Sequence, residues 1–395
     1  METYFMITRE PPATHSTPVL QDPTLQPERR RRFEWGTLRW FCLWVFFWAG
    51  GIEARAAGEE AAPNASARLD HTKPLFYRNA TGQILPAISV DDWQQRRAAI
   101  LAGMQEVMGP LPGQEKRSPL QMEVKEEVDC GSYVRRFITY SPEPRGLIPA
   151  YLLVPKDVLT GGKQAPAVLC LHQTHALGQK VVVGLGNSTN DEYGVELAKQ
   201  GFVCLAPAYP LLANYKPDLK LLGYQSGTLK AVWDNIRGLD LLESLPFVKR
   251  GKFGAIGHSL GGHNAIFTGV FDERIKVIVS SCGFDSFQDY MNGDIKGWTS
   301  DRYMPKLAKY PLAEIPFDFY ELIGALAPRV CFVSAPFYDT NFKWRSVFQI
   351  EEAAAKVYNL YNVPGQFRVE HPKCGHEFPK EMREAAYTLF NEHLR

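Results

Sequence analysis

Net charge is almost absent from this sequence of 395 residues, which contains 44 lysines and arginines against 43 aspartates and glutamates. A chain without an excess of basic residues has no electrostatic field that would draw it to a polyanion, and the motifs of DNA- and RNA-binding proteins are missing as well. We therefore expect no nucleic-acid partner. With 45% hydrophobic and 22% charged residues, the chain has the composition of a folded globular protein.

Cysteine is scarce, and none of the seven cysteines stands at a spacing typical of zinc ligands. We therefore predict no metal site and no cofactor. Cys170, Cys204 and Cys331 lie within apolar runs, where a thiol behaves as a small core side chain. Cys282 and Cys374 fall at the ends of predicted strands, and either a disulfide between them or two free thiols would fit the sequence.

No apolar run near the N-terminus reaches the ~20 residues that a membrane-spanning helix needs. The uncharged stretch Trp40–Ile52 is shorter, follows the arginines at 29–32, and precedes an A-x-A site at Ala54–Ala56. These parts match a secretory signal. We predict that residues 1–57 are a leader and signal peptide and that the protein is exported to the periplasm or the medium, without a stable membrane partner. An uncleaved membrane anchor is the alternative.

The remaining chain divides into an N-terminal extension, residues 58–118, and a larger domain, residues 119–395. Apolar spacing in the extension predicts an amphipathic helix over residues 91–108, which "GPLPG" terminates. Three extended segments at 121–128, 132–140 and 146–154 begin the larger domain and predict antiparallel strands. The helix of the extension is expected to pack through its apolar face on another part of the protein.

Beyond residue 155, apolar strand-like runs alternate with longer helical patterns. The strand candidates are residues 165–172, 202–209, 252–259, 276–283, 329–336 and 367–372, and the helix candidates are 191–200, 227–245, 262–270, 344–361 and 379–394. This alternation is typical of an α/β protein with a parallel sheet. We predict a mostly parallel central sheet of about eight strands, helices on both faces, and antiparallel N-terminal strands.

The motif "GHSLGG", Gly257–Gly262, places a serine at the corner between a predicted strand and a predicted helix. Such a turn lifts the Ser259 hydroxyl above the carboxyl edge of the sheet, and the glycines allow strand and helix to approach closely. The N–H groups at the start of the helix suit a developing negative oxygen. A phosphate-binding turn is the alternative, but the G-x-G-x-x-G pattern is not met.

A serine nucleophile needs a histidine base and a carboxylate that orients it. His376 lies just beyond the last predicted strand, and Asp339 lies just beyond the strand before it. The chain order serine, aspartate, histidine is the order of α/β-hydrolases. We therefore predict Ser259, Asp339 and His376 as a catalytic triad.

Other acids and histidines lie near these strand ends. Asp318 is expected to cap a helix, and His371, which stands before a proline, fits a structural role better than catalysis. Asp285 follows an earlier strand, and Asp339 is favoured over it because Asp339 follows its strand in the expected chain order. His258, inside the serine motif, is expected to have no acid–base duty. His172, at the end of a strand, is expected to act as a hydrogen-bonding pillar.

An oxyanion hole requires two or more N–H groups directed at one oxygen. The residue after the nucleophile supplies one of them in this kind of site, so the backbone N–H of Leu260 is the first candidate. The second should come from the loop "LHQTHALGQ", and the candidates are the backbone N–H groups of Thr174 and Gln173.

At these positions the chain resembles the α/β-hydrolase superfamily over roughly residues 120–395. More narrowly, it resembles exported bacterial, planctomycete-type proteins that are dienelactone-hydrolase-like or acetylxylan-esterase-like, and the segments that carry this likeness are "LHQTH", "GHSLGGHNAIFTGVFDERIKVIVSSCGF", "GWTSDRYMP", "PFDFYELIGALAPR", "DTNF" and "CGHEFP". The resemblance implies the triad Ser259, Asp339 and His376 and a carbohydrate-ester substrate. Dienelactone hydrolases have a cysteine nucleophile, whereas position 259 is serine.

The long loop 284–316 is lid-like, and its aromatic residues Tyr290, Trp298, Tyr303 and Tyr310 could face a cleft. Trp298 and Tyr303 in this loop and Trp344 after the acid are candidates for substrate binding, although aromatic side chains equally suit a packed lid. We predict a serine hydrolase that cleaves a carboxylic ester through an acyl-enzyme, with a small acyl (acetyl) ester of a carbohydrate or polysaccharide as substrate. An acyltransferase or peptidase with the same triad, and a binding protein that kept the fold, are the alternatives.

Overall fold

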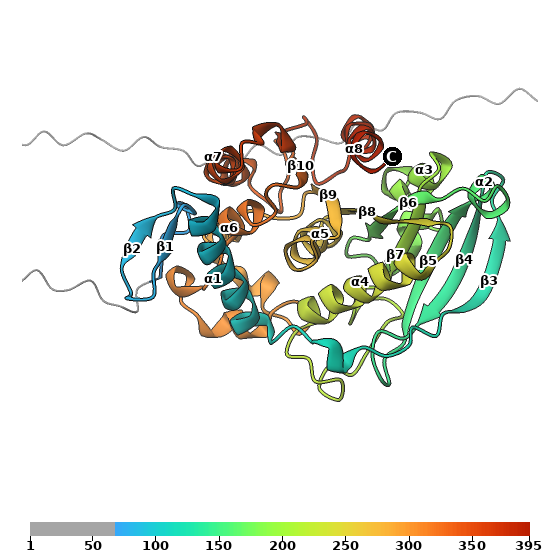
Figure 1. Ribbon diagram of the computed structural model, residues 1–395, viewed down its shortest axis with the longest axis horizontal. Helices are drawn as coiled ribbons and strands as arrows, with labels where there is room; N and C mark the ends of the chain where they lie inside the picture. The colour runs from blue at the N-terminus through green and yellow to red at the C-terminus, as the bar shows by residue number, and fades with distance from the viewer. Residues whose placement is uncertain (1–67) are drawn as a thin grey trace, which may run out of the picture. The chain divides into compact units, whose positions relative to one another are not determined.

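A sheet of nine strands runs through residues 68–395, the part of the chain that the computed structural model describes (Figure 1). In spatial order the strands are β11 (Phe367–Glu370), β10 (Val330–Ser334), β9 (Ile275–Ser281), β8 (Val248–His258), β6 (Ala165–Leu171), β7 (Val203–Pro207), β5 (Ile148–Pro155), β4 (Tyr133–Tyr140) and β3 (Glu123–Asp129). Strands β6 to β11 are parallel, and β3, β4 and β5 are antiparallel to their neighbours. The mostly parallel sheet with antiparallel N-terminal strands is confirmed.

Burial differs between the middle and the edge of this sheet. Every residue of β6, β7 and β10 is buried, because helices cover both faces of the parallel part. Strand β3 is exposed along most of its length and carries the charged run Glu123–Glu127 at the sheet edge. Charged side chains on an edge strand discourage pairing with another chain. Strand β3 corresponds to the predicted segment 121–128, and the sheet has nine strands, where about eight were expected.

Helices cover the two faces of the sheet with two separate apolar cores. On one face α3 (Tyr193–Lys199) and α8 (Lys380–Leu394) pack with Cys170, Ile256 and Phe332 of the strands. On the other face lie α4 (Gly227–Ser244), α5 (Leu260–Phe271) and α7 (Trp344–Leu360). The short helix α2 (Lys156–Thr160) links β5 to β6. The predicted helices on both faces are therefore present.

The N-terminal extension contains a two-stranded ribbon, β1 (Phe76–Arg78) and β2 (Ile84–Pro86), followed by helix α1 (Val90–Met108). Ser89 and Asp92 form a capping box at the start of α1. Trp93 and Met104 of α1 are buried in the same core as α4 and α5. The extension and the sheet domain thus share one core, as Figure 1 shows for α1 beside α6 (Phe319–Gly324).

The segment 284–316, expected as a lid-like loop, is built from short 3-10 helices. They are η4 (Tyr290–Gly293), η5 (Ile295–Trp298), η6 (Pro305–Lys309) and η7 (Leu312–Glu314). Trp298, Met304 and Ile315 from this segment are buried in the main core. The segment is followed by α6, whose first turn is capped by Asp318, as predicted.

Two further expectations concern the thiols and the membrane. Cys282 and Cys374 are both free thiols, so of the two possibilities given for them the disulfide is not formed.

Within residues 68–395, no helix has the length and apolarity needed to cross a bilayer. The predicted leader and signal peptide, residues 1–57, lie outside the described residues.

Candidate active site

Ser259 stands at the sharp turn between β8 and α5. Its backbone has φ 54° and ψ −119°, a left-handed conformation that is rare for a residue with a side chain and is common at functional turns. A Cβ on Gly261 would overlap the carbonyl oxygen of Leu171, and a Cβ on Gly257 would overlap the backbone of Gly261. The two glycines therefore have the mechanical role expected from the motif.

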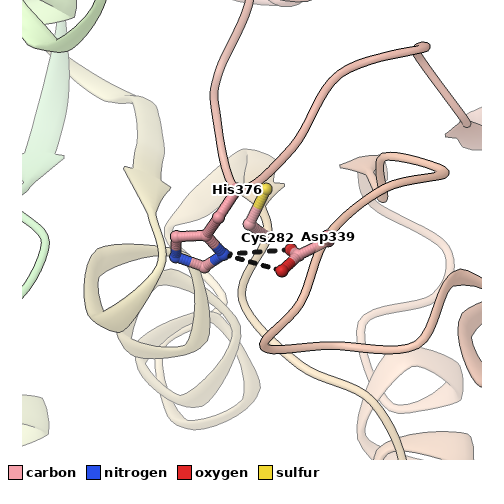
Figure 2. A group of neighbouring side chains, drawn as sticks. All are labelled: Cys282, Asp339 and His376. Carbon is pink, nitrogen blue, oxygen red and sulfur yellow. Dashed lines mark hydrogen bonds and ion pairs between the residues drawn. The ribbon is translucent and has the colours of Figure 1, made fainter. Parts of the chain in front are cut away.

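Asp339 and His376 meet at the carboxyl edge of the sheet, as predicted from their positions after β10 and β11. The His376 Nδ1 lies 3.0 Å from each carboxylate oxygen of Asp339, to which it donates (Figure 2). Because Nδ1 carries the proton, the neutral ring leaves Nε2 as a base, and Figure 2 shows this nitrogen facing away from Asp339.

Backbone groups hold the Asp339 carboxylate from the opposite side. The N–H groups of Asn341 and Phe342 donate to Oδ1 at 2.7 and 3.2 Å. Burial opposes ionisation of Asp339, but the hydrogen bond and charge of His376 together with these N–H groups outweigh it and lower the pKa of Asp339. Asp339 is therefore a stable anion that fixes the orientation of the imidazole.

Ser259 and His376 line the same cavity, which has a volume of about 360 Å³. No hydrogen bond joins the Ser259 hydroxyl to His376 among the described residues. Such bonds are often long before substrate binds, so the shared cavity is the relevant observation.

His258 packs beside this pair. Its ring centroid lies 4.9 Å from that of His376, and its Nδ1 lies 3.1 Å from the Ser281 hydroxyl. Burial and the neighbouring His376 lower the pKa of His258 to about 3, so the ring is neutral. Its placement fits the expected packing role.

The candidate oxyanion donors all belong to residues that line the cavity, namely Leu260, Gln173 and Thr174. Leu260 is the first residue of α5, so its N–H has no partner within the helix. His172 holds the opposing loop, because its Nε2 accepts from the N–H of Tyr209 at 3.0 Å and its Nδ1 donates to the Gln173 carbonyl at 2.8 Å. The predicted pillar role of His172 agrees with these bonds.

The cavity is uncharged and aromatic. Among residues 68–395, no lysine, arginine, aspartate or glutamate lines it, and its lining includes the aromatic side chains of Tyr290, Trp298, Tyr303 and Phe342. Trp298 and Tyr303 are thus where a substrate-binding role would require them. His263, Asn341 and Phe342 also line the cavity, although the sequence interpretation assigned a role to none of them. The spacing of four residues between Ser259 and His263 on one helix could have identified the latter.

Trp344 lies elsewhere. It does not line the cavity, because it starts α7 and its ring packs 4.8 Å from Phe337 and 5.5 Å from His371. Tyr310 is also outside, where its hydroxyl donates to Glu106 at 2.7 Å. Trp298 and Tyr303 are the members of the predicted aromatic set that reach the serine's cavity, together with Tyr290.

The rival acids and the rival histidine have other partners. Asp318 caps α6 and accepts from the N–H of Phe287, and Asp285 accepts from the N–H of Lys343 at 3.0 Å. His371 donates from Nδ1 to the carbonyl of Ala335 at 2.7 Å. None of them hydrogen-bonds the triad residues, which agrees with the preference for Asp339 and His376.

Cys282 is the third member of the group drawn in Figure 2. One ligand atom from each of Cys282, Asp339 and His376 lies within 4.8 Å of the others, a set that could hold a metal ion. The carboxylate and Nδ1 are already bonded to each other, and burial raises the pKa of the Cys282 thiol far above its ordinary value. The arrangement therefore fits a hydrogen-bonded Asp–His pair with a protonated thiol beside it.

Comparison with known proteins gives relatives of one kind. No protein-family model matches the chain. "Putative hydrolase YtaP" of Bacillus subtilis (strain 168) is 28% identical over 262 residues, which are 62% of this chain and 83% of that protein. A 4-O-methyl-glucuronoyl methylesterase of Phanerochaete carnosa (strain HHB-10118-sp) is 27% identical over 190 residues, 41% of this chain and 45% of that enzyme, so the match spans less than half of the relative.

Among solved structures, a glucuronoyl esterase from Solibacter usitatus superposes with a TM-score of 0.64 at 20% identity. The match covers 84% of this chain and 100% of that one. A likeness at this identity concerns the fold alone. Together with the mostly parallel sheet described above, it shows that the chain has the α/β-hydrolase fold.

Proposed function

We propose that this protein is a serine esterase that acts on a carbohydrate ester. The observation that carries the proposal is the Asp339–His376 pair at one cavity with Ser259, which sits on a strained turn at the start of α5. The relatives include a hydrolase and a methylesterase of a sugar acid, which supports this class of reaction.

The chemistry follows from the positions of the three side chains. The Ser259 oxygen attacks the ester carbonyl while Nε2 of His376 takes its proton, and Asp339 stabilises the imidazolium. The carbonyl oxygen becomes negative and is stabilised by the N–H of Leu260 together with that of Thr174 or Gln173. Collapse breaks the carbon–oxygen bond, and His376 protonates the leaving alcohol. Water then cleaves the acyl-enzyme by the same proton transfers.

The lining of the cavity and the names of the relatives together support a carbohydrate ester as the substrate. The cavity of about 360 Å³ is neutral and has an aromatic wall, which suits a sugar ring beside a small ester group. Two esters are candidates: an acetyl group on a sugar hydroxyl, and the ester of a uronic acid such as the methylesterase relative cleaves. The proposed export of the protein by residues 1–57 would bring it to polysaccharide outside the cell.

The test is hydrolysis by purified wild type and by Ser259→Ala. We expect wild type to cleave p-nitrophenyl acetate and at least one of acetylated xylan and a glucuronoyl methyl ester, and Ser259→Ala to lose at least about 10³-fold in kcat on each. Ser188→Ala, at an exposed serine, is the matched control and should keep the wild-type rate. Equal rates for Ser259→Ala and wild type would reject the mechanism.

The alternatives have their own readouts in the same assay. An added alcohol acceptor that receives most of the acyl group would identify an acyltransferase, and cleavage of peptides in preference to esters would identify a peptidase. Binding of carbohydrate with no turnover of any ester would identify a binding protein. Export is tested by expressing the full chain and sequencing the N-terminus of the released protein, which should begin near residue 57.

A further inference from the structure

Two polar groups in the wall of the cavity have no partner in the protein. We infer that the His263 imidazole and the Trp298 indole N–H form a subsite that binds hydroxyl groups of a neutral sugar unit next to the ester. This inference rests on the proposed esterase function, because it names what the same cavity recognises. It adds two positions for specificity to the three that would carry the chemistry.

The first observation is the missing hydrogen bonds. Nε2 of His263 and Nε1 of Trp298 are both buried and neither has a hydrogen-bond partner, while both side chains line the cavity beside Ser259. The two residues are 1% and 4% exposed. Most buried polar atoms in proteins are paired, because an unpaired one costs free energy, so each exception needs a reason. A ligand that supplies the missing partners is such a reason.

The second observation is how the pair is held. His263 lies four residues after Ser259 on α5, so both face the same side of the helix. The His263 ring stands edge-on to Trp298, with the centroids 5.2 Å apart, and is also packed at 5.2 Å from Phe267. This packing holds the His263 imidazole in a fixed position relative to Ser259. A sugar hydroxyl bound by the imidazole would therefore hold the neighbouring ester in a fixed position relative to the Ser259 oxygen.

Tyr303 is the partly exposed neighbour of this pair in the lining of the cavity. Its ring centroid lies 5.6 Å from both His263 and Trp298, and it is only half-buried. A small movement of Tyr303 would let a hydroxyl reach the two nitrogens, whereas movement of α5 or of the buried core would be far more costly. Movement of this partly exposed ring is therefore the expected way for a ligand to reach the two nitrogens.

The third observation is the absence of charge. Burial lowers the pKa of His263 to about 3, so its ring is neutral and offers one donor and one acceptor. The indole of Trp298 adds a donor. No charged side chain lines the cavity among the described residues, so a free carboxylate on the sugar would find no counter-ion. The groups present match hydroxyls and exclude an unesterified sugar acid.

The experiment compares substrates with and without hydroxyl groups. His263→Phe keeps the ring shape and Trp298→Phe keeps an aromatic ring, but both remove the polar atoms. We expect kcat/KM on an acetylated xylo-oligosaccharide to fall about 10- to 100-fold further than kcat/KM on p-nitrophenyl acetate in each variant. Trp93→Phe is the matched control, because Trp93 also has a buried unpaired indole N–H but lies on α1, away from the cavity.

The outcomes separate this inference from the proposed function. Equal losses on both substrates, or no loss on either, would overturn the hydroxyl subsite while leaving the esterase intact. If wild type hydrolyses no ester, the proposed function fails, and titration calorimetry with xylotriose then decides the subsite alone. Binding to wild type that weakens at least tenfold in His263→Phe supports the subsite, and binding that is absent or unchanged contradicts it.

Discussion

The two walls of the cavity treat their polar groups differently. Ser259 and His376 form the reacting wall. Asp339 does not line the cavity, and its carboxylate accepts hydrogen bonds from His376 and from two backbone N–H groups. On the aromatic wall, which consists of Tyr290, Trp298 and Tyr303, the indole N–H of Trp298 has no partner. The groups proposed for chemistry are oriented by the protein itself, and the groups proposed for recognition remain free for a ligand.

Two carboxyl groups with buried side chains, Asp339 and Asp285, differ in the direction of their pKa shifts. Bonds from His376 and the backbone lower the pKa of Asp339 against the effect of burial, whereas burial raises the pKa of Asp285 to about 7. Asp285 accepts one N–H at Oδ2 and leaves Oδ1 unpaired. Burial alone therefore does not identify the orienting acid, and the partners decide it.

The largest expected effect comes from changing the orienting acid. Asp339→Asn should lower kcat about 10⁴-fold on every ester, because an amide no longer holds the His376 tautomer that leaves Nε2 free. Asp285→Asn is the matched control and should keep kcat within about fivefold. The measurement is steady-state kinetics on p-nitrophenyl acetate. A loss in Asp285→Asn as large as that in Asp339→Asn would reverse the assignment of the two acids.

The next effect compares Gly261, in the serine turn, with Gly297, in the segment that carries Trp298. A methyl group on Gly261 would overlap the Leu171 carbonyl, which belongs to a buried strand, so Gly261→Ala should lower the free energy of unfolding by about 3 kcal/mol or more. A methyl group on Gly297 would meet the hydroxyl end of the Tyr290 side chain, which can move. Gly297→Ala should therefore cost less than about 1 kcal/mol. Urea unfolding measures both, and equal costs would show that the serine turn is not the more rigid wall.

The third effect is a pH dependence of stability at Asp285. In the unfolded chain this carboxyl ionises near pH 4, but in the folded protein it stays protonated to about pH 7, so the folded state binds more protons in between. The contribution of Asp285 to the stability of the folded state is fully present below about pH 4 and is lost as the pH rises through 7. Asp285→Asn removes this loss. We therefore expect the difference in unfolding free energy, variant minus wild type, to be roughly 1 to 3 kcal/mol larger at pH 9 than at pH 5.

This expectation is checked by urea unfolding of both proteins at the two pH values. The Oδ1 of an asparagine can accept the Lys343 N–H as the carboxylate does, so the local fold should be kept. The same difference between the proteins at pH 5 and pH 9 would contradict a raised pKa at Asp285.

The smallest effect is expected at Cys282, next to the Asp339–His376 pair. Burial raises the pKa of this thiol far above its usual range, so it remains protonated and unreactive. Iodoacetamide at pH 8 should leave the esterase rate unchanged, and Cys282→Ser should keep kcat within about threefold because the hydroxyl can donate to the Glu377 carbonyl as the thiol does at 3.4 Å. Cys374→Ser is the matched control. Rapid inactivation that Cys282→Ser abolishes would show an ionised thiol.

The three residues of the proposed triad could be anticipated from the sequence because each of them follows an apolar run. Such runs give the strands, the carboxyl ends of parallel strands meet at one edge, and Ser259, Asp339 and His376 stand just beyond three of them. The aromatic wall gave a weaker signal. Trp298 and Tyr303 belong to short 3-10 helices or turns without a hydrophobic period, so their direction depends on contacts with the rest of the fold.

Other features depended on tertiary contacts that local pattern does not contain. Trp344 has the same chemistry as Trp298, but α7 starts at Trp344 and turns its ring towards Phe337. Strands β1 and β2 have three residues each, too few for alternation to be read. The neighbourhood of Cys282 and Asp339 follows from the pairing of β9 with β10, which places two distant turns side by side.

The packing of helix α1 has a consequence for transferring this pocket to another protein. A Cβ on Gly103 of α1 would lie 2.8 Å from the Pro316 carbonyl oxygen, so helix and segment touch through their backbones. At the other end of the contact, Tyr310 and Lys306 bond to Glu106 of the same helix. Segment 284–316 is shaped by residues that precede the hydrolase-like sheet. A graft of this segment onto another esterase would therefore need α1 as its scaffold, and the two must be moved as one piece.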